Sequence, residues 1–370
     1  MKTGICKQLG IDVPIFAFTH CRDVVVEVSK AGGIGVLGVA GFTPTQLKAE
    51  LDWIDDRIGD HPYGIDVIMP VTDLAQGVSD LASLIPEQHK AWVEQVMQRY
   101  NIPPMPEEAD GKSGHGISGD QIGWQHAIAR ASLEEGFKHS NCKVMVNALG
   151  TPPADIMAEC KAKGILVGAL AGRLKHALAH KAGGVDFIIA QGHEAGGHTG
   201  DVTTMVLVPQ VVDAVAPLPV LAAGGIGSGR QVAAAMALGA QGVWCGSIWL
   251  TSPESEVAPL QKSRLIDASS EDTVRTRMLS GKPARMLKSK WTEAWNEPDC
   301  PGFLPMPLQG MLVMEANHRI DRAQDKELAF YPVGQVVGQL NQEKACRTIM
   351  YELMEGYADT VERMHANLHE

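Results

Sequence analysis

The chain has 370 residues, of which 45% are hydrophobic and 20% are charged, enough for one large domain or two of medium size. Its formal net charge of -11, without a dense basic run, argues against nucleic acid or an anionic membrane as a partner, because both need a positive patch. Seven widely spaced cysteines argue against a disulfide framework. Because we find neither a signal peptide nor an apolar run of about 18 to 20 residues, we expect a cytoplasmic protein.

Short apolar stretches alternate with stretches of helical character along most of the chain. Strands are predicted over Ile15–Phe18, Gly35–Val39, Ile65–Met69, Lys143–Ala148, Ile165–Ala169, Asp186–Gln191, Val220–Ala222 and Gly242–Cys245. Helices are predicted over Asp23–Ala31, from Thr43-Pro44 onward, and over Pro153–Lys163, Arg173–Ala182, Thr204–Val215 and Gly229–Leu238. Repeated βα units predict a parallel sheet, and eight of them in about 250 residues match a closed (β/α)₈ TIM barrel. A doubly wound open sheet is the alternative.

The alternation breaks twice. From about 71 to 138 the chain contains several prolines and the loose string GKSGHGISGD, with helical pieces at Glu87–Tyr100 and Gln121–Phe137. We interpret this segment as an excursion over one face of the barrel. The expected domains are a barrel over 1–250, a smaller and mainly helical substrate-capping region over 251–330, and a tail over 331–370, in which an amphipathic helix at Glu343–His365 packs back on the barrel.

Two glycine-rich strings imitate nucleotide-binding motifs. Gly32–Gly38 contains G-x-G-x-x-G, but a helix precedes it and a strand follows it, which is the reverse of the dinucleotide fingerprint. Gly111-Lys112-Ser113 resembles the end of a P-loop, but Pro106 stands where the motif needs its first glycine. We therefore interpret the first string as the end of a helix and the second as a loop.

Glycines after the seventh and eighth predicted strands indicate a phosphate site. Gly224-Gly225 follows the seventh strand just before a helix, and Gly246-Ser247 follows the eighth. Glycine allows close approach of the backbone, and the N–H groups at a helix start favour an anion. Barrel enzymes often hold a ligand phosphate at this place, although two plain βα turns remain the alternative.

The loop Gln191–Asp201, QGHEAGGHTGD, follows the sixth predicted strand at the end of the barrel where catalytic residues collect. Gly196-Gly197 would let the backbone lie against a flat ligand. His193 and His198 are five residues apart on a glycine-broken loop, which does not fit the zinc motif H-E-x-x-H, so no metal is expected. An unperturbed histidine has a pKa of about 6.5, which makes His198 the acid/base or anion-binding candidate.

At these motifs the sequence resembles the nitronate monooxygenase (2-nitropropane dioxygenase) family, whose relatives include flavin-dependent enoyl-ACP reductases and NAD(P)H:quinone reductases. The resemblance covers Pro14–Val39, Tyr63–Pro70, Ala148–Ser247, Gly281–Met286 and Gly334–Asn341. It implies FMN in a (β/α)₈ barrel, with His198 as the catalytic residue. The residues expected to bind the flavin are Ala17, Phe18, Thr19, Asp66, Gln191, Gly196, Gly197, Gly224, Gly225, Gly246 and Ser247, with His20 and His193 as candidates on the substrate side.

Two positions depart from the family pattern. Ala17-Phe18-Thr19-His20 stands where the family usually has Ala-Pro-Met, and Asp66 replaces the usual Asn. The expected activity is oxidation of a small nitronate by FMN and O₂ to a carbonyl compound and nitrite. A reductase of enones, quinones or acyl thioesters with NAD(P)H as electron donor is the alternative, and a flavin-binding barrel without turnover is a third hypothesis. The oligomeric state stays open, with a homodimer among the options.

Overall fold

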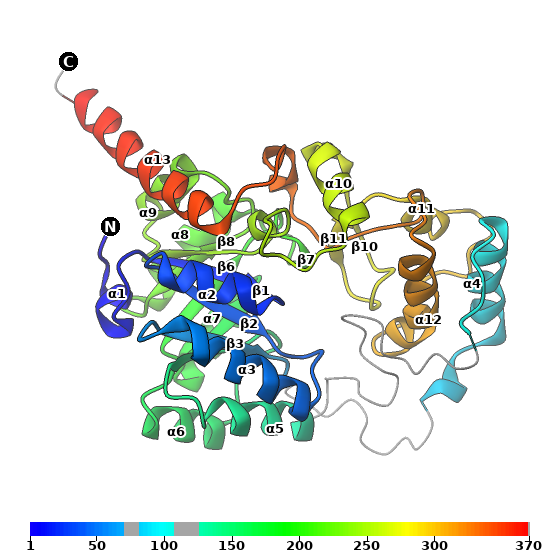
Figure 1. The fold of residues 1–370 in the computed structure, drawn as a ribbon, viewed down its shortest axis with the longest axis horizontal. Coiled ribbons are helices and arrows are strands. Elements are labelled where there is room, and N and C mark those ends of the chain that lie inside the picture. The colour runs from blue at the N-terminus through cyan, green and yellow to red at the C-terminus, as the bar shows by residue number, and fades with distance from the viewer. Residues whose placement is uncertain (70–80, 107–125, 369–370) are drawn as a thin grey trace.

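The computed structural model describes residues 1–69, 81–106 and 126–368. Eight parallel strands close into a barrel in the order β1-β2-β3-β4-β5-β6-β8-β9, which confirms the predicted (β/α)₈ fold (Figure 1). Each lies within about two residues of its predicted position. The strands are β1 (Ile15–Thr19), β2 (Ile34–Gly38), β3 (Tyr63–Val67), β4 (Cys142–Asn147), β5 (Leu166–Ala171), β6 (Phe187–Gln191), β8 (Val220–Ala223) and β9 (Gly242–Cys245).

Apolar side chains fill the inside of the barrel. Phe16 packs between Phe187 and Trp244, with ring centroids 5.9 and 6.3 Å away. The ring of Phe187 lies where a Cβ on Gly168 would stand, only 2.3 Å from it, so the glycine makes room for the large neighbour. The short helix α1 (Gly4–Leu9) adds Ile5 and other apolar residues to this inner core. The barrel is therefore a packed core rather than a pore.

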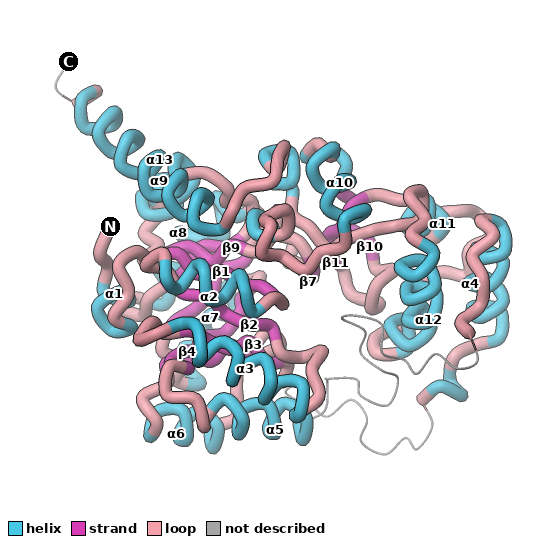
Figure 2. Tube along the Cα trace, in the orientation of Figure 1, coloured by secondary structure: helices cyan, strands magenta, loops and turns pink. Residues whose placement is uncertain are grey.

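Helices cover the outside of the barrel and bury a second apolar layer against the strands (Figure 2). They are α2 (Arg22–Lys30), α3 (Pro44–Ile58), α5 (His126–Gly136), α6 (Ala154–Ala162), α7 (Leu174–Gly183), α8 (Thr204–Val215) and α9 (Gly229–Ala237). The start predicted at Thr43-Pro44 is confirmed, because Thr43 and Gln46 form a capping box. The first residues of the helix predicted at Gln121–Phe137 and the string GKSGHGISGD lie outside the described residues.

A separate apolar core holds the capping region together. It joins the excursion helix α4 (Glu87–Arg99) to the segment from Met278 to Leu328. The helices and strands of the region after β9 are α10 (Pro259–Asp267), β10 (Thr273–Thr276), β11 (Ala284–Leu287), α11 (Lys290–Ala294) and α12 (Leu308–Ala323). One short 3₁₀ turn, η1 (Ala82–Leu84), precedes α4, and three follow β9, namely η2 (Ser247–Trp249), η3 (Ser270–Asp272) and η4 (Gln335–Gln339). The capping region thus combines two parts of the chain that the sequence keeps far apart.

The barrel and the capping region meet at a small three-stranded sheet. Its order is β10-β11-β7, and β7 (Gly197–His198) comes from the loop after the sixth barrel strand. Figure 1 shows β7 between the barrel and the helices of the capping region. This sheet was not predicted, because a two-residue strand has no sequence period of its own.

The C-terminal helix α13 (Cys346–Ala366) packs on α9 and α2, and its outer end projects from the body of the molecule (Figure 1). It crosses α9 at a glycine pair, where a Cβ on Gly229 would come 2.3 Å from the carbonyl carbon of Gly356. No helix within the described ranges is both long and apolar enough to cross a membrane. All seven cysteines are free thiols.

Candidate active site

The predicted site residues gather at the carboxyl end of the barrel. Because all eight strands are parallel, the last residues of β1, β3 and β6 and the turns after β8 and β9 surround the same opening. These places carry Ala17, Phe18 and Thr19, Asp66, Gln191, Gly224 and Gly225, and Gly246 and Ser247. The topology therefore brings the residues that the sequence predicted separately to one mouth of the barrel.

Asp66 is a buried acidic residue, and one of its carboxyl oxygens lacks a hydrogen-bond partner. Its side chain is 4% exposed, and its Oδ1 atom has no hydrogen-bond partner. Burial raises the pKa of Asp66 well above its usual range, and the backbone N–H of Ala148 opposes this shift only in part. Burial therefore favours the neutral form of this carboxyl, which keeps spare hydrogen-bonding capacity at the end of β3.

The first-strand segment fills part of the mouth with aromatic rings. Phe18 stacks on Trp244 with ring centroids 5.9 Å apart and meets His20 edge-on at 5.2 Å. The Nδ1 atom of His20 lies 3.1 Å from the carbonyl oxygen of Gly38, so Nδ1 carries the proton. A Cβ on Gly38 would stand 2.6 Å from the His20 ring, so this glycine makes room for it. The phenyl and imidazole rings thus form one packed group at the end of β1.

The turn after β8 borders a cavity of about 340 Å³. Gly224 and Gly225 have positive φ angles of 102° and 73°, a backbone conformation that favours glycine. A Cβ on Gly224 would lie 2.9 Å from the hydroxyl of Thr204. The cavity is also lined by Glu194 and Gln231, and Gln231 braces the turn by donating from Nε2 to the carbonyl of Gly225. The glycines therefore shape a tight turn at the edge of a cavity that side chains, among them the Glu194 carboxylate, also line.

The turn after β9 is tied to the segment that follows the capping region. The Ser247 hydroxyl accepts a hydrogen bond from the Gly334 N–H at 2.9 Å, which leaves its own O–H free to donate. A Cβ on Gly196 would come 2.7 Å from the backbone of Val333 and Gly334. Gly196 therefore serves close packing of two chain segments, a role that the sequence did not indicate.

Gly197, by contrast, has open space on its side-chain face and a positive φ of 71°.

His193 lies inside the loop rather than at its tip. The backbone N–H of His193 donates to the carbonyl oxygen of Val202 at 2.8 Å, and its ring Nδ1 lies 3.3 Å from the carbonyl oxygen of Gly200. Glu194 accepts from the N–H and hydroxyl of Thr204 at the start of α8. His193 and Glu194 therefore brace the loop with their own side chains.

His198 is positioned by a strand of the capping region. It lies on β7, opposite Ala284 of β11, and its Nε2 atom is 2.6 Å from the hydroxyl oxygen of Ser280. The N–H of Lys282 also donates to this hydroxyl, at 3.3 Å. Contacts about 80 residues away in the chain, rather than the loop's own sequence, thus fix the imidazole.

The environment keeps the His198 ring neutral. The His198 residue is exposed to solvent, but the protein atoms around its ring disfavour the imidazolium, and the positive charge of Lys282 adds to this effect. Together they lower the pKa of His198 to about 4. The structure therefore differs from the sequence expectation of an unperturbed histidine, because the sequence shows neither the packing around the ring nor that Lys282 lies nearby.

Sequence reasoning missed Ser280 and two arginines, Arg275 and Arg285, of the hairpin formed by β10 and β11. Arg285 donates to the carbonyl of His193, and Arg275 donates to Thr199 and Asp201. The resemblance at Gly281–Met286 already pointed to this segment, although no role followed from it. Only the antiparallel pairing of β11 with β7 shows what these residues contact.

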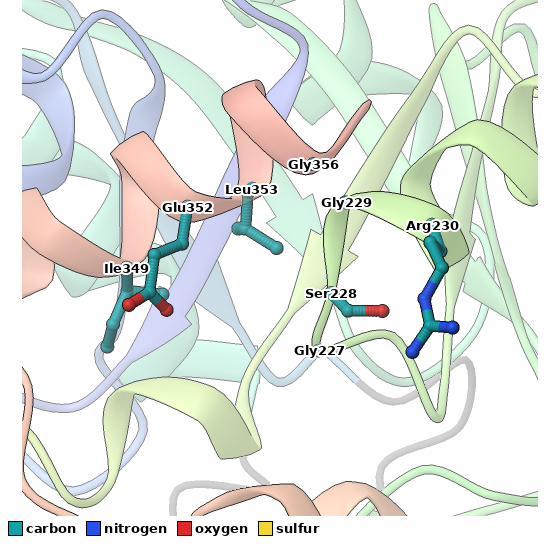
Figure 3. Close-up of a pocket in the computed structure, with 8 residues that line it drawn as sticks. All are labelled: Gly227, Ser228, Gly229, Arg230, Ile349, Glu352, Leu353 and Gly356. Atoms are coloured by element: carbon teal, nitrogen blue, oxygen red, sulfur yellow. The ribbon is translucent and has the colours of Figure 1, made fainter. Parts of the chain in front are cut away.

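A second cavity, of about 200 Å³, lies between the start of α9 and α13 (Figure 3). Ser228 and Arg230 border it from α9, and Glu352 borders it from α13, where Lys344 pairs with Glu352 at 2.8 Å. Figure 3 shows the Arg230 side chain away from Glu352, on the other side of the cavity. None of the residues predicted for the site lines this cavity.

Comparisons with known proteins agree over almost the whole length. A family model described as nitronate monooxygenase matches residues 7–356. A putative monooxygenase of Mycobacterium tuberculosis is 47% identical over 372 aligned positions, which cover 98% of each chain. A probable nitronate monooxygenase of Staphylococcus aureus is 29% identical and covers 90% of this chain and 91% of its own. The likeness therefore includes the barrel and the capping region.

Solved structures share this architecture. FabK from Thermotoga maritima superposes with a TM-score of 0.75 at 26% identity, covering 99% of both chains. Nitroalkane oxidase from Streptomyces ansochromogenes superposes with a TM-score of 0.79 at 24% identity, covering 97% of this chain and 99% of the other. The second likeness shows a common fold.

Proposed function

The chain belongs to the nitronate monooxygenase family, and we propose that it is an FMN-dependent enzyme that oxidises alkyl nitronates with O₂ to a carbonyl compound and nitrite. The observation that carries this proposal is the position of His198. Its neutral imidazole is within hydrogen-bonding distance of the Ser280 hydroxyl and is held on β7, in the loop after the sixth barrel strand. The strand ends at the same mouth of the barrel offer a place for a cofactor. The relatives named as nitronate monooxygenases support the same reaction class.

The residues at the mouth fit FMN. The glycine turn at Gly224-Gly225 offers a backbone cradle for the phosphate, and the free O–H of Ser247 can donate to it. The unpartnered Oδ1 of Asp66 gives the polar edge of a flavin ring a partner in an otherwise apolar place. When bound, the flavin would supply the electron transfer between substrate and O₂.

His198 has a defined part in this scheme. Because the ring is neutral near pH 7, it can take the α-proton of a neutral nitroalkane onto a ring nitrogen, leaving the carbanionic nitronate. Toward a substrate that arrives as a nitronate, the neutral ring can donate one hydrogen bond to a nitro oxygen. Attraction by an imidazolium charge is not available at neutral pH, and Lys282 supplies the nearby positive charge instead.

A reductase of enones, quinones or acyl thioesters that uses NAD(P)H is the second candidate. A larger substrate pocket formed by the tryptophan-rich segment would favour it. Trp291 and Trp295 are instead buried in the capping core, where their rings meet at 5.6 Å. We therefore rank this activity below nitronate oxidation.

Replacement of His198 with Asn tests the proposed role. With a neutral nitroalkane as substrate, we expect the rate of nitrite release to fall by about a hundredfold or more, since a general base typically contributes this much. The FMN content should stay the same. His176→Asn, on the exposed face of α7, is the matched control and should keep full turnover. Unchanged turnover in His198→Asn would remove His198 from the mechanism.

A further inference from the structure

The loop His193–Asp201 is held at both ends by arginines of one hairpin. The hairpin consists of β10 and β11, which belong to the capping region, whereas the loop extends from the barrel. One arginine, Arg285, contacts the first residue of the loop, and the other, Arg275, contacts its last residues. His198 lies between these two attachment points.

Arg285 holds the beginning of the loop. Its side chain is 4% exposed, and its Nε and Nη2 atoms both donate to the carbonyl of His193 at 3.2 Å. Its Nη1 atom donates to the hydroxyl of Thr273 at 3.0 Å, which fixes the guanidinium in the hairpin. The strand register places Arg285 opposite Gly197, next to His198. A fork of two hydrogen bonds therefore fixes both the distance and the direction of the loop.

Arg275 holds the end of the loop. Its Nε donates to the hydroxyl of Thr199 at 3.0 Å, and its Nη2 donates to the carbonyl of the same residue at 3.2 Å. Nη2 also contacts the Asp201 carboxylate at 2.6 Å, and Arg173 from the barrel side pairs with the other oxygen of Asp201 at 2.6 Å. These charges lower the pKa of Asp201, so it remains an anion at the junction.

The two arginines are directly opposite each other on the hairpin. Like charges at such a cross-strand pair are normally destabilising. Burial, together with repulsion from Arg275, lowers the pKa of Arg285. The loop supplies the carbonyl of His193 and the carboxylate of Asp201 as acceptors for these two positive side chains.

We propose that Arg285 and Arg275 are positioning residues that clamp the loop His193–Asp201 and thereby orient His198 for the reaction. This inference rests on the proposed function for the part of His198 in turnover, but not for the clamp itself. It gives the capping region a second role besides covering the substrate. The hairpin holds a group that the barrel supplies.

Amide hydrogen exchange of the FMN-loaded protein tests the clamp without reference to activity. In Arg285→Met, we expect exchange in the segment 193–201 to speed up at least tenfold, including the Thr199 amide, which donates to Pro283. Arg264→Met is the matched control, because Arg264 also donates to a backbone carbonyl, that of Lys288, but does not touch the loop. The control should leave exchange in 193–201 unchanged.

Steady-state kinetics with a nitroalkane at saturating FMN test the consequence for His198. We expect kcat to fall at least tenfold in Arg285→Met while KM changes less, because the substrate still enters the mouth. Arg285→Lys, which keeps the charge but not the fork, should recover only part of the loss. Since Arg285 is buried and its loss could impair folding, Arg275→Gln provides a second variant at a half-buried position, with a smaller change of the same sign.

The outcomes separate the clamp from the function. Faster exchange together with lower kcat supports the proposal. Unchanged exchange in both arginine variants overturns the clamp, and faster exchange with unchanged kcat overturns its role in positioning His198. If His198→Asn keeps full turnover, the proposed function loses its histidine, while the exchange result still decides whether the arginines hold the loop.

Discussion

The barrel core and the capping core are assembled from the chain in different ways. Each strand of the barrel pairs with the next barrel strand along the sequence, and βα units follow one another. The capping core instead joins residues 85–102 to residues 278–328 and is held by contacts between distant segments. The comparison teaches that local βα units fix the turns that we propose as the FMN site, whereas long-range contacts hold the histidine loop in place.

The largest effect is expected where the two parts of the capping core are fastened together. Arg319 of α12 is 5% exposed and donates to the carbonyls of Pro103 and Ile102 at 2.8 and 2.9 Å. Arg319→Met leaves these carbonyls without partners, which should lower the free energy of unfolding by about 2–4 kcal/mol. Denaturant unfolding followed by tryptophan fluorescence, with Trp92, Trp291 and Trp295 in this core, measures the loss.

Arg99→Met is the control for this prediction. Arg99 pairs with Glu297 at 2.7 Å on the surface of the same region, and such exposed pairs contribute about 1 kcal/mol or less. Bound FMN should be retained in both variants, since neither residue lies at the mouth of the barrel. Loss of FMN in Arg319→Met alone would show that the barrel seat depends on the capping core, contrary to the comparison.

A smaller effect, confined to the barrel, is expected at the glycine turn. Gly224→Val forces a positive φ on a β-branched residue and places its Cβ 2.9 Å from the Thr204 hydroxyl. We expect the turn to shift and so relieve this strain of about 1–3 kcal/mol, and FMN to bind about tenfold to a hundredfold more weakly, because binding must restore the strained geometry. Fluorescence titration of the apoprotein with FMN measures this.

Gly184→Val separates strain from site geometry. Gly184 also has a positive φ, of 84°, but its side-chain face is open and it follows α7 on the outside of the barrel. The control should lose stability while it binds FMN normally. Equal weakening in both variants would mean that the turn at Gly224 has no special part in binding the cofactor.

The last effect concerns Asp66 and depends on pH. Burial raises the pKa of Asp66 in the folded state, whereas in the unfolded chain it is about 3.9. The folded state therefore keeps a proton that the unfolded state releases, and this contribution to stability is present below about pH 3.9 and declines as the pH rises. Asp66→Asn has no such proton to lose.

The melting temperature of apo Asp66→Asn, relative to the original protein, should therefore be higher at pH 8 than at pH 4. Thermal unfolding at the two pH values measures the difference. Asp12→Asn, at an exposed residue paired with Lys2, should show no such trend. A difference that stays constant with pH would mean that Asp66 is ionised in the folded protein.

The sequence predicted what repeats locally. Each buried strand is a short apolar run, and the helix start at Thr43-Pro44 carries its own cap. The barrel could therefore be predicted from the alternation of strand and helix patterns and from the residues that begin the helices. The glycine turns and His198 could be selected because strand order places them at one mouth. Asp66 was selected only through the resemblance to a family.

The rest depends on contacts that no local pattern encodes. The sheet β10-β11-β7 includes a strand of two residues, and Ser280 meets His198 across 82 positions of the chain. Arg285 looks like any charged residue in the sequence, and its burial follows from the hairpin's place against the loop. The lowered pKa of His198 likewise depends on the protein packed around its ring and, to a lesser extent, on the nearby Lys282, neither of which the sequence shows.

Anaerobic mixing of the FMN-loaded protein with an alkyl nitronate tests the central claim most directly. Loss of the yellow flavin absorbance on adding the nitronate, with no change on adding NADH or NADPH, is the predicted result. Rapid bleaching by either nicotinamide, with a spectrum that the nitronate leaves unchanged, would contradict nitronate oxidation and identify a reductase.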